Sequence, residues 1–300
     1  MTPAPTSPPR KDLVLVVDDS PIDRRLAAGL LGNAGYATKT AENGRAALLA
    51  MEEGRPDLVL TDLAMPEMDG LALVEAVRAR WPEVPVILMT GVGSEEIAVR
   101  ALQRGAASYV PKRELAASLA STVRSILAVR SAPAPASTRE DAPSSWEVPS
   151  DLAEIGPLVA RLEARLGRSG LTDETGRLQV SVALREALAN AILHGNLQLS
   201  SSLKEDDPEA HDRLLAQRRE TAPYRDRRVR LTVEEGATAV TYVVRDEGDG
   251  FDPAALPDPT DAANLERTTG RGLFLIRTFM DEVRHADGGR TLTMVKRRSS

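Results

Sequence analysis

The sequence predicts an α/β protein that begins with a doubly wound, five-stranded parallel sheet. Residues 12–19 (DLVLVVDD), 57–62 (DLVLTD) and 84–90 (VPVILMT) are short apolar runs separated by helical patterns, as is typical of parallel strands covered on both faces. Each run ends in a polar side chain, and SYVPK at 108–112 ends in a lysine. Open α/β sheets bind ligands at these carboxyl ends. We expect strands near 13–17, 36–40, 57–61, 84–89 and 107–110, and a last helix over about 114–130.

The polar residues at the strand ends predict a phosphoryl-accepting site. Asp18, Asp19 and Asp62 would repel one another and need a hard divalent cation, for which Mg2+ is the best candidate. Asp62 would attack a phosphoryl group, while Lys112 offsets the developing charge and Thr90 hydrogen-bonds the added oxygens. Any one strand-end aspartate could instead simply solvate a loop, but the ordered set is much more specific.

Two further features relate this segment to a known family. The sequence LTDLAMPEMDG runs on through Asp62, and Tyr109 lies three residues before Lys112. Residues 11–130 thus resemble the receiver domain of two-component response regulators, although Arg113 stands where that family more often has an apolar residue. The resemblance implies Asp62 as the phospho-acceptor, Asp18 and Asp19 as metal ligands, Lys112 as the charge partner, and Thr90 with Tyr109 as the switch pair.

Length and composition limit what else the chain can be. Its 300 residues suffice for two domains. The net charge is 38 − 44 = −6, with acids and bases interspersed, so we expect no direct DNA binding. The chain has no cysteine, its opening MTPAPTSPPRK is unlike a signal peptide, and no apolar run approaches the ~20 residues of a membrane span. We therefore expect a cytoplasmic protein without membrane segments.

A linker is expected between the two domains. Residues 131–150 (SAPAPASTREDAPSSWEVPS) contain four prolines and many Ala and Ser residues. Pro133 and Pro135 should end the preceding helix, so the domains would communicate by docking and release of their surfaces.

A new pattern begins at 151 and continues to 298. Leu152, Ile155, Val159, Leu162 and Leu166 form an apolar stripe on a helix. Packing of this stripe on a sheet is favoured, although a coiled-coil seam, and hence a homodimer, stays open. Further helices are expected over 175–195 and 272–281, and strands near 228–234, 238–245, 283–286 and 291–296.

Three motifs in this region predict a second phosphate site. Glu186, Asn190 and His194 in REALANAILHGN share one helix face, which alone would indicate only a solvated face. DEGDGFD (246–252) follows a strand, and TTGRGLFLI (268–276) enters a helix. Glycines at such positions allow close backbone approach to an anion, and the helix offers its positive end to phosphates. The order of the motifs makes the signal specific.

That order resembles the GHKL-type ATP-binding fold, a two-layer α/β sandwich shared by histidine kinases, gyrase-type ATPases and anti-sigma-factor serine kinases. The resemblance covers about 150–298, and HGN with the C-terminal sequence is most similar to the anti-sigma branch. It implies ATP with Mg2+ as cofactors, Glu186 as catalytic base, Asn190 as Mg2+ ligand, Asp246 on the adenine amino group, Gly248 and Gly250 at the adenine, Gly270 and Gly272 at the phosphates, Thr291 as a weaker adenine contact, and 251–271 as a lid.

These resemblances imply a two-component response regulator in a phosphorelay. An upstream histidine kinase would phosphorylate Asp62, and the output would be a serine/threonine kinase acting on an anti-anti-sigma (STAS-like) or sigma-factor partner. A nucleotide-binding partner switch and an atypical histidine kinase are the alternatives. The latter is disfavoured because 131–184 contain no histidine, and His211 follows the Asn190 motif. The insert 199–228, with seven acids and seven bases, is either a solvated excursion or a docking surface.

Overall fold

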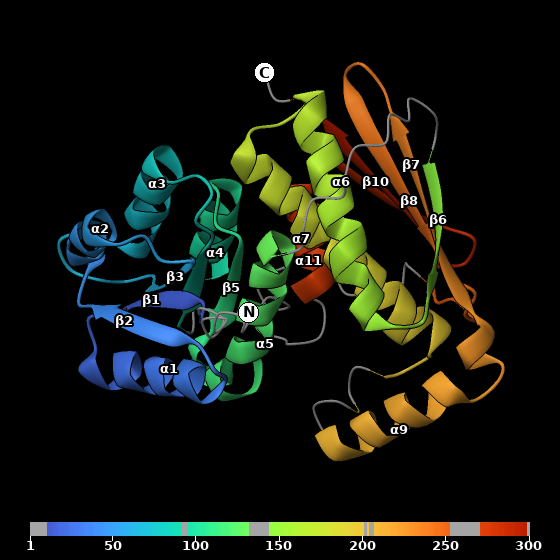
Figure 1. The fold of residues 1–300 in the computed structure, drawn as a ribbon, viewed down its shortest axis with the longest axis horizontal. Coiled ribbons are helices and arrows are strands. Elements are labelled where there is room, and N and C mark those ends of the chain that lie inside the picture. Colours follow the sequence, from blue (N-terminus) through green and yellow to red (C-terminus); the bar gives the residue numbers. More distant parts are fainter. Residues whose placement is uncertain are drawn as a thin grey trace, which may run out of the picture. The chain divides into compact units, whose positions relative to one another are not determined.

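The computed structural model contains two five-stranded sheets, each with its own helices (Figure 1). Residues 11–91, 95–131, 144–200, 203, 207–252 and 271–298 are described by the structure. Neither sheet shares a strand with the other.

The first sheet is parallel throughout and has the strand order β2-β1-β3-β4-β5. This is the doubly wound order in which ligands bind at the carboxyl edge. All residues of β3, β4 and β5 are buried, as the continuous apolar runs predicted. The strands are β1 (Leu13–Val17), β2 (Ala37–Ala41), β3 (Leu58–Asp62), β4 (Val86–Thr90) and β5 (Ser108–Pro111).

Helices cover this sheet, and polar caps set where three of them begin. The side chains of Ser20, Asn43 and Asp69 each accept a hydrogen bond from the backbone N–H three residues later. Such caps satisfy N–H groups that the first helical turn leaves unpaired. The helices are α1 (Pro21–Asn33), α2 (Gly44–Glu53), α3 (Gly70–Arg80), α4 (Glu95–Gln103), the 3-10 turn η1 (Lys112–Glu114) and α5 (Leu115–Ser131).

The second sheet is antiparallel, in the order β6-β7-β8-β10-β9. Alternate residues of β7 and β8 are buried, because helices cover one face of this sheet (Figure 1). The result is the expected two-layer sandwich. Its elements are β6 (Ser144–Pro149), α6 (Ile155–Ser169), α7 (Glu174–Asn190), β7 (Arg228–Glu235), β8 (Ala239–Arg245), α11 (Arg271–Phe279), β9 (Glu282–Ala286) and β10 (Thr291–Arg297).

Strand β6 lies within the segment expected to be a linker. Residues 144–149 pair antiparallel with β7, with Trp146 opposite Leu231, and the buried Ser144 and Val148 face the interior. The proline and serine content concealed a short strand at the edge of the sheet, where missing backbone donors are tolerated. Residues 132–143 of the expected linker lie outside the part of the chain that the structure describes.

Two features of the helices differ from expectation. Leu152 is 38% exposed in the 3-10 turn η2 (Leu152–Glu154), whereas the rest of the apolar stripe is buried in α6 within the single chain. The helix expected over 175–195 changes character at Ala191, where α7 continues into the π-helix η3 (Ala191–Asn196). The wider π turn breaks the spacing of four that would have aligned His194 with Asn190.

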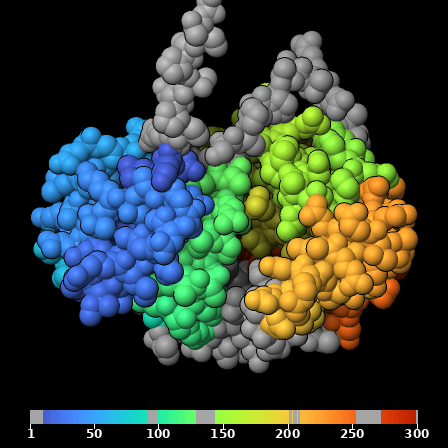
Figure 2. All heavy atoms as spheres, turned by 60° about the horizontal axis from the view of Figure 1, so that its bottom comes forward, coloured from blue at the N-terminus to red at the C-terminus, as the bar shows by residue number. Residues whose placement is uncertain are grey.

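The charged insert contains regular structure on the surface of its domain. Helix α9 (Pro208–Glu220) starts with Asp207 as its N-cap, and the 3-10 turn η4 (Tyr224–Asp226) follows it. The orange segment in Figure 2 includes this helix. Among the helices that the structure describes, none is long and apolar enough to cross a membrane.

Candidate functional site: two phosphate centres

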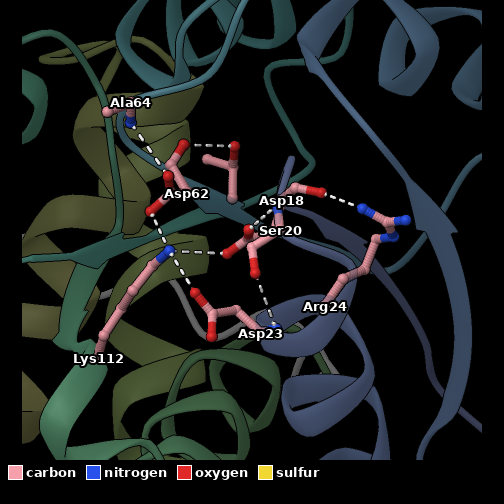
Figure 3. Close-up of polar contacts among 8 residues, drawn as sticks. Asp18, Ser20, Asp23, Arg24, Asp62, Ala64 and Lys112 are labelled. Carbon is pink, nitrogen blue, oxygen red and sulfur yellow. Dashed lines mark hydrogen bonds and ion pairs between the residues drawn. The ribbon is translucent and has the colours of Figure 1, made fainter.

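The first centre lies at the carboxyl edge of the parallel sheet. Asp18 directly follows β1, Asp62 ends β3, and Lys112 follows β5. The Lys112 Nζ lies 2.9 Å from Asp18 Oδ2 and 2.9 Å from Asp62 Oδ1 (Figure 3). Burial disfavours the ammonium, but the hydrogen bonds that Lys112 donates to these two carboxylates nevertheless raise the pKa of Lys112. The expected meeting of strand-end residues is therefore observed.

The same edge presents a set of oxygens suited to a divalent cation. Asp18, Asp19 and Asp62 each offer a carboxylate oxygen, and these atoms all lie within 4.8 Å of one another. Octahedral Mg2+ with ligands at about 2.1 Å needs oxygens no more than about 4.2 Å apart, which a small adjustment would satisfy. Burial raises the pKa of Asp18 despite the nearby Lys112. A bound cation would compensate that cost, so the donors fit Mg2+.

Thr90 and Tyr109 lie on the two neighbouring strands of the same edge. Thr90 ends β4 and is 7% exposed, while Tyr109 in β5 is 3% exposed. The parallel register places Tyr109 beside Leu88 and Pro111 beside Thr90. Tyr109 is thus an inward-facing ring in this structure, and its role as a switch with Thr90 stays a prediction.

A fourth acidic residue at this centre was missed by the sequence reasoning. Asp23 Oδ2 lies 3.2 Å from Lys112 Nζ, because Asp23 occupies the first turn of α1, which starts just after the Asp18–Asp19 pair. The neighbouring Arg24 guanidinium donates to the Asp18 carbonyl. An acid in the first turn of a helix that begins at a phosphate site was the available signal.

The second centre begins where α7 packs against α11. Glu186 and Asn190 lie one turn apart on α7, and Gly272 lies near the start of α11. A Cβ on Gly272 would come within 2.6 Å of Glu186 Oε2 and 3.5 Å of Asn190 Nδ2. A side chain would collide with the Glu186 carboxylate there, so glycine is needed for this approach. The E-x-x-x-N and G-x-G motifs therefore meet.

Asp246, in the DEGDGFD motif, lies against the end of the helical segment that carries Glu186 and Asn190. It follows β8, and a Cβ on Gly195 would lie 2.6 Å from Asp246 Oδ1. The Gly248 N–H donates to that oxygen at 2.9 Å. Burial raises the pKa of Asp246, an effect that the Gly248 N–H and the Arg290 and Arg227 charges only partly offset. A half-buried carboxylate held in this way is suited to accept a hydrogen bond from a ligand amino group.

The other residues expected at this centre are placed as follows. Gly250 has a positive φ of 79°, and the adjoining Phe251 N–H donates to the Gly288 carbonyl. Thr291 pairs with Arg245, the residue before Asp246, while its Oγ1 donates to Asp287 Oδ2 at 2.8 Å. Gly270 and most of the expected lid lie outside the residues that the structure describes. His194 Nδ1 lies 2.6 Å from the Leu199 carbonyl.

Asn196 was not singled out from the sequence, yet it fastens this centre. The residue is fully buried. Its Oδ1 accepts the Glu247 N–H at 2.8 Å, and its Nδ2 donates to Ser150 Oγ at 3.1 Å. The last residue of the π-helix thereby holds the loop that carries Asp246. An asparagine ending a largely apolar helix was the signal, because a buried amide requires partners.

Comparisons with known families agree with both centres. Residues 14–124 match the response regulator receiver domain, and residues 148–296 match the histidine kinase-like ATPase domain. The chain thus contains a receiver domain followed by a histidine kinase-like ATPase domain. A domain of the latter kind implies ATP binding, usually with Mg2+.

Individual relatives match between about a third and three-fifths of the chain. The DNA-binding transcriptional regulator NtrC of Salmonella typhimurium is 42% identical over 103 residues, covering 34% of this chain and 22% of the relative. Protein-glutamate methylesterase/protein-glutamine glutaminase 1 of Anaeromyxobacter dehalogenans is 34% identical over 183 residues, covering 58% and 52%. The solved receiver domain of NtrX from Brucella abortus is 37% identical over 34% of this chain and 90% of its own, with a TM-score of 0.33. The chain thus spans between about a fifth and half of these curated relatives.

Proposed function

We propose that this protein is a response regulator in which phosphorylation of Asp62 controls an ATP-dependent serine/threonine kinase of the anti-sigma type. The kinase assignment depends chiefly on one observation, the approach of Glu186 and Asn190 to Gly272. This approach supports the proposal, because Glu186 as a general base would then lie next to the expected metal and phosphate positions. The proposed substrate is a serine or threonine of an anti-anti-sigma (STAS-like) protein, with a sigma factor as a further partner.

In the proposed first reaction, an upstream histidine kinase supplies the phosphoryl group. An Asp62 oxygen attacks phosphorus, and the phosphorus–nitrogen bond to the donor histidine breaks. Lys112 is already 2.9 Å from Asp62 Oδ1, where its charge offsets that of the incoming group. Mg2+ held by the three aspartates would supply further charge compensation.

The contact surface proposed for the donor lies on α1. Ile22 and Leu26 are 73% and 51% exposed, and a spacing of four puts them on one helix face. The first turn of the same helix carries Asp23, which contacts Lys112. A protein that delivers a phosphoryl group to Asp62 must approach this end of α1, and the apolar pair would bury against it.

In the proposed second reaction, the phosphoryl group of ATP moves to a protein hydroxyl. The hydroxyl oxygen attacks the γ-phosphorus, the bond to the β–γ bridging oxygen breaks, and ADP leaves. Glu186 accepts the hydroxyl proton, while Asn190 is suited to hold Mg2+ and Asp246 to accept from the adenine amino group. General-base assistance of this kind contributes about 10²–10⁴ in rate.

Glu186→Gln tests the kinase directly, with Glu174→Gln as a control because Glu174 is an exposed residue in the first turn of the same helix. Partners are captured in ATP, and their phosphosites are identified by mass spectrometry. Glu186→Gln should keep its nucleotide affinity, but its rate of phosphoryl transfer should fall by a factor of about 10²–10⁴. If the wild type holds ATP and partner but yields no phosphorylated product, the protein is a binding switch instead.

A further inference from the structure

The charged insert is more closely tied to the nucleotide centre than a solvated excursion would be. The structure describes residues 207–228 of this insert continuously. Its charged residues include Arg218 on α9 and Arg227 just after η4. Both side chains donate to backbone carbonyls at the end of the π-helix η3, at Leu197 and Asn196.

Arg218 holds the chain where it leaves the π-helix. Its Nη1 donates to the Leu197 and Gln198 carbonyls, both at 2.6 Å. Gln198 has a φ of 53°, a left-handed conformation that is unfavourable for a residue with a side chain. A guanidinium bonded to both carbonyls stabilises this turn and so fixes the position of Asn196.

Tyr224 couples Arg218 to the second arginine. The Arg218 Cζ lies 4.8 Å from the centre of the Tyr224 ring, and the Arg227 Cζ lies 5.1 Å from it. Guanidinium groups at these distances are attracted to the ring face. One aromatic side chain therefore organises two cations that act on different parts of the same centre.

Arg227 reaches the loop that carries Asp246. Its Nη1 donates to the Asn196 carbonyl at 2.7 Å, and its Nη2 lies 3.9 Å from Asp249 Oδ1. Only 16% of its side chain is exposed, so water screens its charge weakly. The next residue adds a second tie, because the Arg228 N–H donates to Glu247 Oε2 at 2.9 Å. The insert thus contacts Glu247 and Asp249, which follow Asp246 in its loop, and Asn196, which holds that loop.

We propose that the insert is a built-in brace of the adenine-recognition loop, in which Arg227 is a positioning residue that holds Asp246 ready for the nucleotide. The proposal uses only the ATP binding contained in the proposed function and does not require kinase activity. A segment outside the three nucleotide motifs would then set nucleotide affinity.

Arg227→Met and Arg227→Lys test the brace, with Arg213→Met as a matched control because Arg213 is an exposed arginine of α9 paired only with Glu209 among the described residues. ADP affinity is measured by calorimetry on the full chain. We expect Arg227→Met to weaken binding about five- to fiftyfold. Arg227→Lys should retain part of the affinity, and Arg213→Met should bind like the wild type.

Tyr224 provides a second test that removes no hydrogen-bonding arginine. Tyr224→Phe keeps the ring face and should bind ADP normally, whereas Tyr224→Leu uncouples the two arginines and should bind several-fold more weakly. If Arg227→Met does not fold, this pair still decides the question. Equal affinity of Tyr224→Phe and Tyr224→Leu would overturn the coupling.

Two readouts separate positioning of Asp246 from general stability. In the Asp246→Asn background, Arg227→Met should cost much less affinity, because coupled residues are not additive. In nucleotide-free protein, amide exchange at Glu247 and Gly248 should be faster in Arg227→Met than in Arg213→Met. The brace would be overturned if Arg227→Met cost as much ADP affinity in the Asp246→Asn background as in the wild type. It would also be overturned if Arg227→Met left amide exchange at Glu247 and Gly248 unchanged. Failure of the wild type to bind ADP would overturn the proposed nucleotide function as well.

Discussion

The two phosphate centres of this molecule are constructed in different ways. At the first, Asp18, Asp62 and Lys112 follow strands of one parallel sheet, and the register of the sheet alone brings them together. At the second, the proposed nucleotide-binding residues lie on α7, on α11 and just after β8, and separate ties such as Asn196 join these elements. A site at converging strand ends needs little added support, whereas a site assembled from a helix and loops depends on residues that never touch the ligand. The two kinds of site should therefore respond differently to mutation.

The largest expected effect is at the first centre. Asp62→Asn should abolish Mg2+-dependent labelling by acetyl phosphate, because an amide cannot form the acyl phosphate. ADP affinity should be unchanged, which calorimetry on the same sample would check. Labelling of Asp62→Asn at the wild-type level would remove the receiver assignment of this residue. Glu52→Gln, a change at an exposed helix residue, serves as the control.

Asp246→Asn should have the next largest effect, now at the second centre. Loss of a charge-assisted hydrogen bond worth about 1.5–3 kcal/mol predicts about ten- to a hundredfold weaker nucleotide binding. Because burial raises the pKa of Asp246, wild-type affinity should also fall as the pH is lowered through that raised pKa, whereas the affinity of the variant should not. Calorimetry across pH values measures both effects, and a parallel pH dependence in the variant would argue against Asp246 as the adenine contact.

The same substitution should act on stability in the opposite direction. A raised pKa in the folded state means that Asp246 favours folding most below its ordinary value of 3.8, and that this contribution is lost as the pH rises through the folded pKa. At neutral pH the nucleotide-free Asp246→Asn protein should therefore unfold at a higher temperature than the wild type. Calorimetric scans without nucleotide check this, and a lower Tm would contradict it.

Asn196→Ala tests whether the second centre depends on its ties. Removing this fully buried amide leaves the Glu247 N–H without its observed acceptor and takes one donor away from Ser150 Oγ, which still donates to the Arg227 carbonyl. Such a loss typically costs about 1–3 kcal/mol of unfolding free energy. The unfolding free energy of the second domain is measured by urea denaturation, with Gln217→Ala on α9 as a control. An unchanged midpoint would show that the loop is held in another way.

The smallest effect is expected from Asp23→Asn. Asp23 shares Lys112 with Asp18 and Asp62, and its removal frees the ammonium and lessens repulsion of the phosphoryl anion. A partly exposed ion pair is worth up to about 1 kcal/mol, so acetyl phosphate should label Asp62 up to about fivefold faster. The initial labelling rate measures this, with Glu53→Gln as control. Slower labelling would mean that Asp23 orients Lys112 rather than competing for it.

The same contrast explains what could be predicted from the sequence. The five parallel strands and the convergence of Asp18, Asp62 and Lys112 follow from apolar runs and from the geometry of parallel sheets. The approach of Glu186 to Gly272 was expected from a family resemblance rather than from pattern alone. The long-range hydrogen bonds could not be predicted from any sequence pattern. Asn196 and Ser150, for example, are 46 residues apart, and no local periodicity relates them.

Each local miss has a physical cause. The π turn at 191–196 preserves a helical pattern of apolar residues, so periodicity could not distinguish it from an α-helix. Strand β6 is short and proline-flanked, and its partner β7 decides its conformation more than its own composition does. The insert looked like a solvated face because its charges are balanced, and only the structure shows that Arg218 and Arg227 turn inward onto backbone carbonyls.

Strand β6 also has a consequence for how the protein is made. Its partner β7 begins only at Arg228, so 78 residues (150–227) separate the two strands that must pair. During synthesis, the parallel sheet of the first domain is complete once β5 has emerged. The second sheet cannot form its first strand pair until three-quarters of the chain exists, and closing so long a loop costs entropy before any contact is gained. We therefore expect the receiver to fold on the growing chain well before the ATPase domain can fold, and a product truncated before β7 would carry an unpaired edge strand prone to aggregation.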